Sequence, residues 1–484
     1  MSLSPKIMTA TDDAPIASEP APAPTAAPSE EDGLPTPRRY VAIAAVLVGI
    51  VLVVLDGSIA NLALPIIEGA LQVSPAASVW VVTGYQMAIV MFLLPAAAAG
   101  ESLGYRPVFV AGVAVFTAAS ALCALAPSLP WLIAARFLQG LGSAALMSLA
   151  LALLRFVYPR RLLGAAIGWN ALTVALSSAA GPSIGAAILS VASWPWLFAL
   201  NIPVGIVVLV ASRRLPPTPG SARKIDMLSV ALNAGAFGAL VVGVDLVTRV
   251  PWLGGALLAA SAISLGALVH REMAQTTPLI PLDLLRGHSF RISVIASICC
   301  FSGQMASYVA LPFYIQHGLG LSAFKTGLYM TPWPLAVALM APIAGRLSDR
   351  VSSGWLCTVG GICLAAGLAC AAVWPLEGNA MPLLVFMVMG GLGFGFFQTP
   401  NNRNMLLSAP RDRSGAAGGM QGTARLLGQT IGAVTMTLLF TLTSDAAAPR
   451  IGLGVGAVLA LLAGLVSVLR VPVRRRPLDE RGAD

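Results

Sequence analysis

Charged residues are scarce in this sequence. Only 10% of the 484 residues are Asp, Glu, Lys or Arg, and 57% are hydrophobic, whereas an average soluble domain carries about 25% charged residues. A soluble chain of this length would hold about three domains, and so few charges could not cover their surfaces. The apolar residues must therefore face lipid, which excludes a soluble enzyme.

Residues that bind metals or nucleotides are scarce as well. Lys occurs only at positions 6, 224 and 325, and no GxxxxGK[ST] run is present, so the chain has no ATP-binding loop of that type. The three His lie near loops, and the six Cys fall in apolar stretches without metal-ligand spacing to a His. We expect no metal, no cofactor and no enzyme activity, because no loop places His, Asp and Glu at catalytic spacing.

Long apolar runs dominate what is present. A bilayer core of about 30 Å requires about 20 apolar residues of helix, and such runs, bounded by charged residues, Pro or Gly, predict an all-α membrane protein with fourteen transmembrane helices. The predicted spans are 40–64, 78–99, 107–127, 131–157, 163–190, 196–212, 227–247, 251–270, 290–315, 324–345, 354–375, 381–402, 415–443 and 450–470. An even number of spans places both termini on one side of the membrane.

Polar tails flank the spans. Residues 1–37 are rich in Pro and Ala and carry several acids, so we expect a disordered tail that cannot bury enough apolar surface to fold. This tail lacks the basic and apolar regions of a signal peptide, and the first span is expected to act as an uncleaved insertion signal. Residues 471–484 form a second predicted tail.

The distribution of basic residues predicts the orientation. If the N-terminus is cytoplasmic, only Arg249, Lys325 and Arg450 face outward, while nearly all other Lys and Arg lie in or beside cytoplasmic segments. This asymmetry follows the positive-inside rule, and it accounts for the net charge of +9. We therefore expect both termini in the cytoplasm and no nucleic-acid partner.

Asp56 and Arg136 are ionisable residues inside predicted spans, where such residues usually have a function. Counted from the outer helix ends, Asp56 lies roughly 12 Å deep and Arg136 roughly 8 Å deep, at 1.5 Å per residue. We expect the two residues to share a solvated cavity, in which Asp56 exchanges protons under the influence of Arg136. A fixed ion pair or a polar helix contact remains the alternative.

Arg425 and Asp245 also lie within spans. Arg425 is predicted near mid-membrane, where it could bind an anionic or carbonyl-bearing substrate group or donate to helix-end carbonyls. Asp245 lies three residues from the outer end of its span, so we expect it to reach water. No Asp or Glu falls in any predicted span after Asp245, and the cavity therefore looks poorly suited to a divalent cation.

Four motifs, at residues 55–65, 136–142, 181–185 and 194–205, resemble those of the fourteen-helix drug:proton antiporters of the major facilitator superfamily. Residues 55–65 (LDGSIANLALP) resemble the first-helix motif, and residues 136–142 (RFLQGLG) resemble the fourth-helix motif, whose Arg is linked to proton coupling. Residues 181–185 (GPSIG) resemble the antiporter motif of the fifth helix, and residues 194–205 (WPWLFALNIPVG) the entry into the sixth. The resemblance covers residues 40–470 in the expected order.

This resemblance implies an architecture and a gate. It implies two six-helix bundles, at residues 38–212 and 289–470, with two inserted helices between them in residues 213–288. Gly181, Pro182 and Gly185 make the fifth helix close-packed and able to bend, which suits a gate, although ordinary packing of small residues is the alternative.

Two cytoplasmic loops resemble the family's latch motif. Residues 345–350 (GRLSDR) match it well, whereas residues 100–106 (GESLGYR) replace its Asp with Glu and reduce the basic run to one Arg. The expected latch residues are Glu101, Arg106, Asp349 and Arg350.

We therefore predict a proton-coupled exporter in a bacterial inner (cell) membrane that works as a monomer. Its partners would be protons, the lipid bilayer and a small amphiphilic substrate, either a monovalent lipophilic cation or a neutral or zwitterionic compound. The expected substrate contacts are Tyr85, Gln304, Tyr308, Trp333, Phe397, Asn401 and Arg425. An exporter of one specific metabolite is the alternative, and a membrane receptor or structural subunit without transport is a more distant one.

Overall fold

The computed structural model describes residues 34–159, 163–218, 220, 225–273, 282–375, 379–409 and 414–470. The described part is helical and contains no strand, because in lipid each backbone N–H and C=O group must bond within the protein, and a helix satisfies them inside one segment. The α-helices are α1 (Thr36–Leu71), α2 (Pro75–Ser78), α3 (Trp80–Leu103), α4 (Tyr105–Ala124), α5 (Leu129–Val157), α6 (Leu163–Val191), α7 (Pro195–Ala199), α8 (Asn201–Ala211), α9 (Met227–Val247), α10 (Pro251–Met273), α11 (His288–Phe313), α12 (Ala323–Met330), α13 (Pro332–Leu347), α14 (Ser353–Val373), α15 (Pro382–Leu407), α16 (Ser414–Leu442) and α17 (Ala448–Val468). Three short helical turns are η3 (Ser212–Arg214), η4 (Leu282–Arg286) and η5 (Tyr314–Gly318).

Fourteen segments of the described chain are long and apolar enough to cross a membrane, as the sequence predicts. Four of them combine shorter pieces: α2 with α3, α7 with α8 and η3, α11 with η5, and α12 with α13. The first span is longer than expected, because α1 continues through Pro65 to Leu71. A proline removes only one backbone donor, which a membrane helix tolerates.

Helices α1 to α8 form an N-terminal group and α11 to α17 a C-terminal group, and each group contains the same close helix crossing. In the N-terminal group α4 crosses α5 at Gly112 and Gly142, and in the C-terminal group α14 crosses α15 at Gly360 and Gly393. A methyl group on Gly142 would lie 2.7 Å from the carbonyl oxygen of Gly112, and one on Gly393 would lie 2.7 Å from that of Gly360. Matching glycine crossings indicate an internal repeat, in agreement with the two similar loops at residues 100–106 and 345–350. The division of the chain at residues 212 and 288 stays a prediction.

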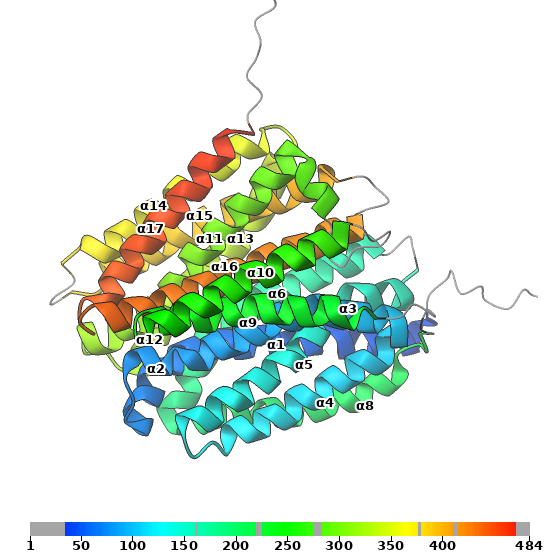
Figure 1. The fold of residues 1–484 in the computed structure, drawn as a ribbon, viewed down its shortest axis with the longest axis horizontal. Coiled ribbons are helices and arrows are strands. Elements are labelled where there is room, and N and C mark those ends of the chain that lie inside the picture. The colour runs from blue at the N-terminus through cyan, green and yellow to red at the C-terminus, as the bar shows by residue number, and fades with distance from the viewer. Residues whose placement is uncertain are drawn as a thin grey trace, which may run out of the picture.

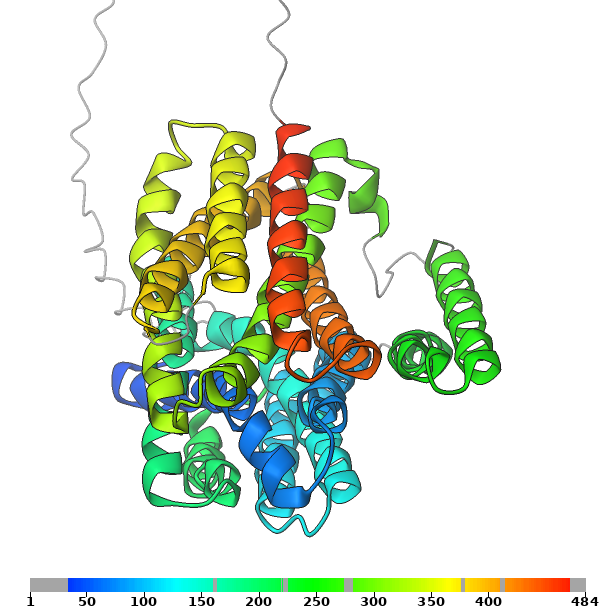
Figure 2. The same cartoon turned by 90° about the vertical axis from the view of Figure 1, so that its left-hand side faces the viewer.

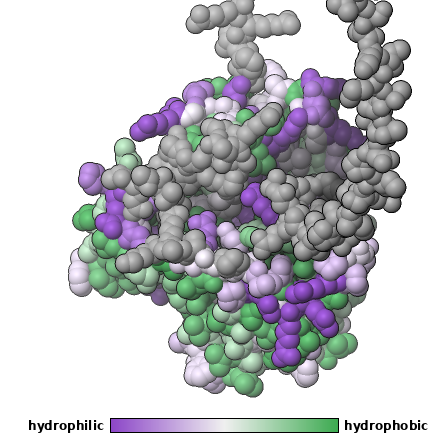
Figure 3. All heavy atoms as spheres, turned by 90° about the vertical axis from the view of Figure 1, so that its right-hand side faces the viewer, coloured by the Kyte–Doolittle hydropathy of each residue, from purple (hydrophilic) through white to green (hydrophobic). Residues whose placement is uncertain are grey.

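The two groups meet at one end of the molecule and diverge toward the other (Figure 1). The end at which α1 begins and α3 and α13 finish, near Arg106 and Arg350, is called the basic end here. At the opposite end, α6 of the N-terminal group contacts α12 and α13, and α1 contacts α11. The Oγ atoms of Ser183 and Thr331 lie 2.7 Å apart, and the Gln316 side chain donates to the Leu62 carbonyl at 3.2 Å. Hydrophilic side chains gather on the face at the basic end (Figure 3).

The α9–α10 pair lies at the side of the molecule, next to α16 (Figure 2). Polar contacts hold α9 against α3: the Asn233 amide donates to the Met91 carbonyl at 2.8 Å, and the Trp80 indole N–H donates to Asp245 at 3.3 Å. The expectation that Asp245 reaches water is wrong, since it is only 8% exposed and also pairs with Arg249 at 3.7 Å.

Glu272 corrects the statement that no acid follows Asp245 within a span. Helix α10 continues to Met273, three residues beyond the expected end, and it carries Glu272 with 1% exposure. The Ser229 hydroxyl of α9 lies 2.7 Å from the Glu272 carboxylate. This acid lies at the basic end of the hairpin rather than between the two helix groups.

Candidate functional site

Asp56 of α1 and Arg136 of α5 form an ion pair inside the N-terminal group. The Arg136 Nη1 atom lies 2.5 Å from the Asp56 Oδ2 atom. The expected solvated cavity is wrong for this state, because Arg136 is completely buried and Asp56 is 4% exposed. Asp56 also lies deeper along its helix than predicted, fifteen residues before the α1 C-terminus at Leu71.

Two neutral amides complete the environment of the Asp56 carboxylate. The Oδ1 atom accepts hydrogen bonds from the Asn201 amide of α8 at 2.8 Å and the Gln139 amide of α5 at 3.0 Å. The Gln139 carbonyl oxygen accepts from Arg136 at 2.6 Å, and its amide also lies 2.8 Å from the Ser120 hydroxyl of α4. Hydrogen bonds of this kind stabilise the negative charge of a buried carboxylate. The site therefore links α1, α4, α5 and α8.

Aromatic rings cover the remaining face of the Arg136 guanidinium. Its central carbon lies 4.1 Å from the centre of the Tyr85 ring and 5.4 Å from that of Phe198. The Arg136 Nη2 atom is buried and has no hydrogen-bond partner in the described part of the chain, while Nε donates to the Val81 carbonyl at 3.2 Å. Attraction between a cation and aromatic faces, which is strongest where water is absent, compensates in part for the missing hydrogen bond.

Tyr85 supports this site from α3. Its side chain is 2% exposed, and its hydroxyl lies 2.8 Å from the Ser143 hydroxyl and 3.4 Å from the Val53 carbonyl. In this state the ring is occupied by Arg136, so the predicted substrate contact of Tyr85 stays a prediction.

Sequence reasoning missed the other members of this site. Gln139, Asn201 and Phe198 lie within the quoted motifs, and Ser120 lies in the third predicted span. For Gln139 and Asn201 the available signal was a polar side chain inside an apolar run, because such a side chain is costly in lipid and usually has a function. Ser120 and Ser143 gave no comparable signal, because serine is a common packing residue between membrane helices.

The predicted gate residues lie where α6 is packed between the two groups. A methyl group on Gly181 would overlap the Ser58 side chain of α1, and one on Gly185 would lie 3.2 Å from Leu62. On the other side of α6, a methyl group on Gly327 of α12 would lie 2.5 Å from the Pro182 carbonyl oxygen. The close approach expected of small residues is present, and the gating role stays a prediction.

The predicted substrate contacts of the C-terminal group do not form one cluster. Tyr308 and Trp333 stack edge to face with ring centres 5.6 Å apart, and Gln304 is half-buried on the same helix as Tyr308. Phe397 is 1% exposed in the core. Asn401 is fully buried, and it donates to the Ser297 hydroxyl at 2.8 Å and accepts from Arg470 at 2.8 Å. The substrate roles of these residues stay predictions.

Arg425 of α16 differs from Arg136 in having no partner. Within the described residues it forms no ion pair or hydrogen bond, and its Nε atom is buried without an acceptor. Its side chain is half-buried. The structure thus contains an uncompensated guanidinium in the middle part of a predicted span.

The four predicted latch residues lie at the basic end. Asp349 pairs with Arg403 of α15 at 2.5 Å, a partner that the sequence did not indicate, while Arg350 is exposed. Arg106 donates to the Arg213 carbonyl at 3.2 Å, and Glu101 is exposed at the end of α3. The latch role of these residues stays a prediction.

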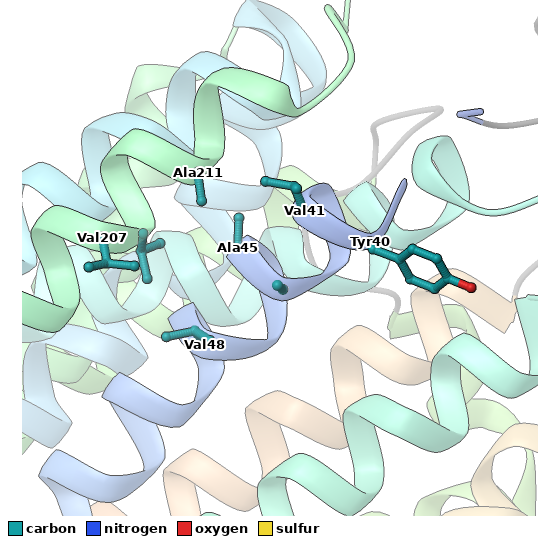
Figure 4. Close-up of a pocket in the computed structure, with 8 residues that line it drawn as sticks. Tyr40, Val41, Ala45, Val48, Val207 and Ala211 are labelled. Carbon is teal, nitrogen blue, oxygen red and sulfur yellow. The ribbon is translucent and has the colours of Figure 1, made fainter. Parts of the chain in front are cut away.

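A surface groove between α1 and α8 is apolar and separate from the ion pair (Figure 4). Its lining includes Tyr40, Val48, Val207 and Ala211. A groove without charged groups has no means of coupling to protons, so the buried ion pair is the candidate functional site. The described residues contain no group of His, Cys, Asp and Glu that could hold a metal ion.

The model of the Major Facilitator Superfamily matches residues 46–433 and 293–483. The chain belongs to this superfamily. It is 45% identical over 449 residues to the uncharacterized transporter YebQ of Escherichia coli, covering 91% of this chain and 98% of that protein. It is 30% identical over 410 residues to the tetracenomycin C resistance and export protein of Streptomyces glaucescens, covering 83% and 76%.

A solved structure shares the fold. It is a POT family transporter in complex with a thioalcohol-conjugated peptide, with a TM-score of 0.69 and 15% sequence identity. The similarity covers 88% of this chain and 95% of that one. The chain is accordingly a polytopic membrane protein of a transporter superfamily.

Proposed function

We propose that the protein is a proton-coupled exporter of small amphiphilic compounds. The buried pair of Asp56 and Arg136 carries the proposal. Burying a carboxylate in a membrane interior costs free energy, and such residues are therefore usually retained for a function. The named export function of the Streptomyces glaucescens relative supports the direction of transport.

We place the basic end in the cytoplasm of a bacterial cell, with both termini on that side, in accordance with the positive-inside rule. The two helix groups diverge toward the basic end (Figure 1), so the structure then corresponds to an inward-facing state. In this state the Asp56 carboxylate is ionised and paired, and the transporter is ready to accept substrate.

The proposed transport cycle depends on the charge of Asp56. After the helix groups move and the outer end opens, a proton from outside binds the carboxylate. The neutral acid attracts Arg136 less strongly, so the hydrogen bonds that join α1, α5 and α8 rearrange. This rearrangement lowers affinity for substrate and permits return to the inward-facing state, where the proton leaves.

The test is transport by the full-length protein in liposomes with an imposed pH gradient. Wild-type protein is expected to move amphiphilic dyes against their gradient, and a protonophore should abolish this movement. Asp56→Asn should remove the gradient dependence, whereas Asp445→Asn, at an exposed acid, should retain it. Full gradient-driven export by Asp56→Asn would overturn the proposal.

An exporter dedicated to one metabolite is the second candidate, and the relative named for tetracenomycin C favours it. Competition between chemically unrelated compounds separates the two. A multidrug exporter shows mutual inhibition across the panel, whereas a dedicated exporter responds to one compound class.

A further inference from the structure

Arg425 lies near the middle of the membrane. It is eleven residues from the start of α16 at Ser414 and seventeen from its end at Leu442, or roughly 16 Å and 25 Å along the helix. An unpaired charge at such a position costs free energy, and ionisable residues inside membrane helices therefore usually mark a substrate or ion site.

The helix geometry directs Arg425 toward the space between the two helix groups. Gly428 of α16 packs against Phe301 and Ser302 of α11, since a methyl group on it would lie 2.9 Å and 3.2 Å from them. Leu426 instead shares a buried cluster with residues of α3. At about 100° per residue, Arg425 lies on the strip of α16 between these two faces, so it faces the junction of α11 with α3.

Two other arginines at least partly buried within the helix groups are neutralised or hydrogen-bonded. Arg136 is paired with Asp56, and Arg470 donates to Ser293 and Asn401, each at 2.8 Å. Arg425 alone among these three has no acceptor in the described part of the chain. Asp245 does not neutralise Arg425, because its partners are Trp80 and Arg249.

We infer that Arg425 binds an anionic group of the substrate, so that the transported compounds are amphiphilic acids. The inference rests on the proposed function and narrows its substrate class. An uncompensated guanidinium in a low-dielectric site repels a lipophilic cation, and its planar donors match the two oxygens of a carboxylate or those of a sulfonate. Neighbouring apolar residues of α3 and α16, including Leu93 and Leu426, suit the hydrocarbon body of such an acid.

The test is equilibrium binding to the full-length protein in detergent, measured by fluorescence anisotropy without any gradient. Fluorescein and rhodamine 6G share a xanthene ring but carry opposite charges, and 1-naphthoate and 1-naphthalenesulfonate, measured by competition with fluorescein, extend the acidic set. Wild-type protein should bind at least one acid about tenfold more tightly than rhodamine 6G. Arg425→Gln should weaken binding of that acid about tenfold or more, the usual range for a charged hydrogen bond, and leave rhodamine 6G binding unchanged or tighter.

Matched variants keep the result interpretable. Arg291→Gln removes an exposed arginine at the start of α11 and should leave both affinities unchanged. Arg425→Gln breaks no hydrogen bond or ion pair of the described residues, so it should melt close to wild type. If it nevertheless fails to fold, Arg425→Lys replaces it, and weaker naphthoate binding with unchanged rhodamine 6G binding is expected.

Three outcomes overturn the inference: preference of wild type for rhodamine 6G, no binding of any of the acids, or equal acid binding by wild type and the tested Arg425 variant. Because binding is measured without a gradient, failure of the proposed function has a separate signature. In that case acids bind through Arg425, but liposomes show no gradient-driven export.

Discussion

Leu426 of α16 packs in one buried cluster with Tyr85 of α3, the residue whose ring covers Arg136. One step along α16 from Leu426 lies Arg425. The proposed substrate-binding residue therefore neighbours, along α16, a buried cluster that reaches the proposed proton site across the boundary between the helix groups. A substrate that displaces α16 would move Leu426 within this cluster, and this movement is a physical route by which substrate binding could be coupled to the proton site.

Among the described residues the buried ion pair occurs in the N-terminal group alone, and the helix repeat identifies the corresponding place in the C-terminal group. A methyl group on Gly140 of α5 would meet the Tyr85 carbonyl oxygen, and one on Gly391 of α15 would meet that of Trp333, so Tyr85 and Trp333 occupy corresponding positions. Tyr85 faces Arg136, whereas the Trp333 ring lies against Gly390. By the same correspondence Gly390 lies at the position of Gln139 and Met387 at that of Arg136, so the C-terminal group has neither the amide nor the guanidinium at these positions.

The ion pair predicts a specific pattern of stability. Asp56→Leu leaves Arg136 buried without its counter-charge and should destabilise the protein by about 3–5 kcal/mol. Adding Arg136→Met removes the stranded charge and should recover most of this loss. Melting followed by tryptophan fluorescence checks both variants; neither should export, and a double variant less stable than Asp56→Leu would contradict the pairing.

Tyr85 tests the contribution of the ring separately from that of the hydroxyl. Tyr85→Phe keeps the ring over Arg136 but loses the hydrogen bond to Ser143, so it should cost about 1 kcal/mol and retain most export. Tyr85→Leu removes the aromatic face, should cost about 2 kcal/mol or more and should reduce export strongly. Melting temperature and dye transport measure the two effects, and equal behaviour of both variants would count against the stacking contribution.

Gly181 tests the close contact of α6 with α1. Gly181→Ala should destabilise by about 1–3 kcal/mol through overpacking against Ser58 and slow transport. The double variant Gly181→Ala with Ser58→Gly frees the space and should restore both properties. Gly454→Ala is the matched control, since a methyl group there meets nothing within 4 Å; a similar loss in this control would exclude a specific contact.

Asp349 and Arg403 test the latch at the basic end. Their side chains are exposed, by 65% and 39%, so breaking the pair should change stability by only about 0–1 kcal/mol. We nevertheless expect Asp349→Arg to slow transport several-fold, because the pair holds the α13–α14 loop against α15. The exchange Asp349→Arg with Arg403→Asp should restore the transport rate in liposomes. If the rate is not restored, Asp349 has a role other than pairing with Arg403.

Features that depend on composition and on depth in the membrane could be predicted from the sequence. The side to which a residue of a helix faces could not, because it depends on how the helix is rotated. Fourteen apolar runs predict fourteen spans because bilayer thickness sets their length, and Asp56 and Arg136 stood out as charges in apolar runs. The facing of Tyr85 into the ion pair, rather than into a cavity, depends on how α3 is rotated. The partnership of Asp349 with Arg403 depends on a contact 54 residues apart in the chain, which no local pattern encodes.

The charge of the substrate determines the electrical signature of transport. Export of a monovalent acid in exchange for one proton moves two positive charge equivalents inward per cycle, whereas export of a monovalent cation for one proton moves none. A membrane potential that is negative inside therefore drives the first exchange and leaves the second unaffected. In liposomes in which the basic end of the protein faces the lumen, a potassium gradient with valinomycin imposes this potential without a pH difference. We expect the potential alone to accelerate export of a monovalent acid such as 1-naphthalenesulfonate in wild type and in Arg291→Gln, and to have no effect in Asp56→Asn. Export of the acid at a rate independent of potential would show that the exchange is electroneutral and that a second ion accompanies the substrate.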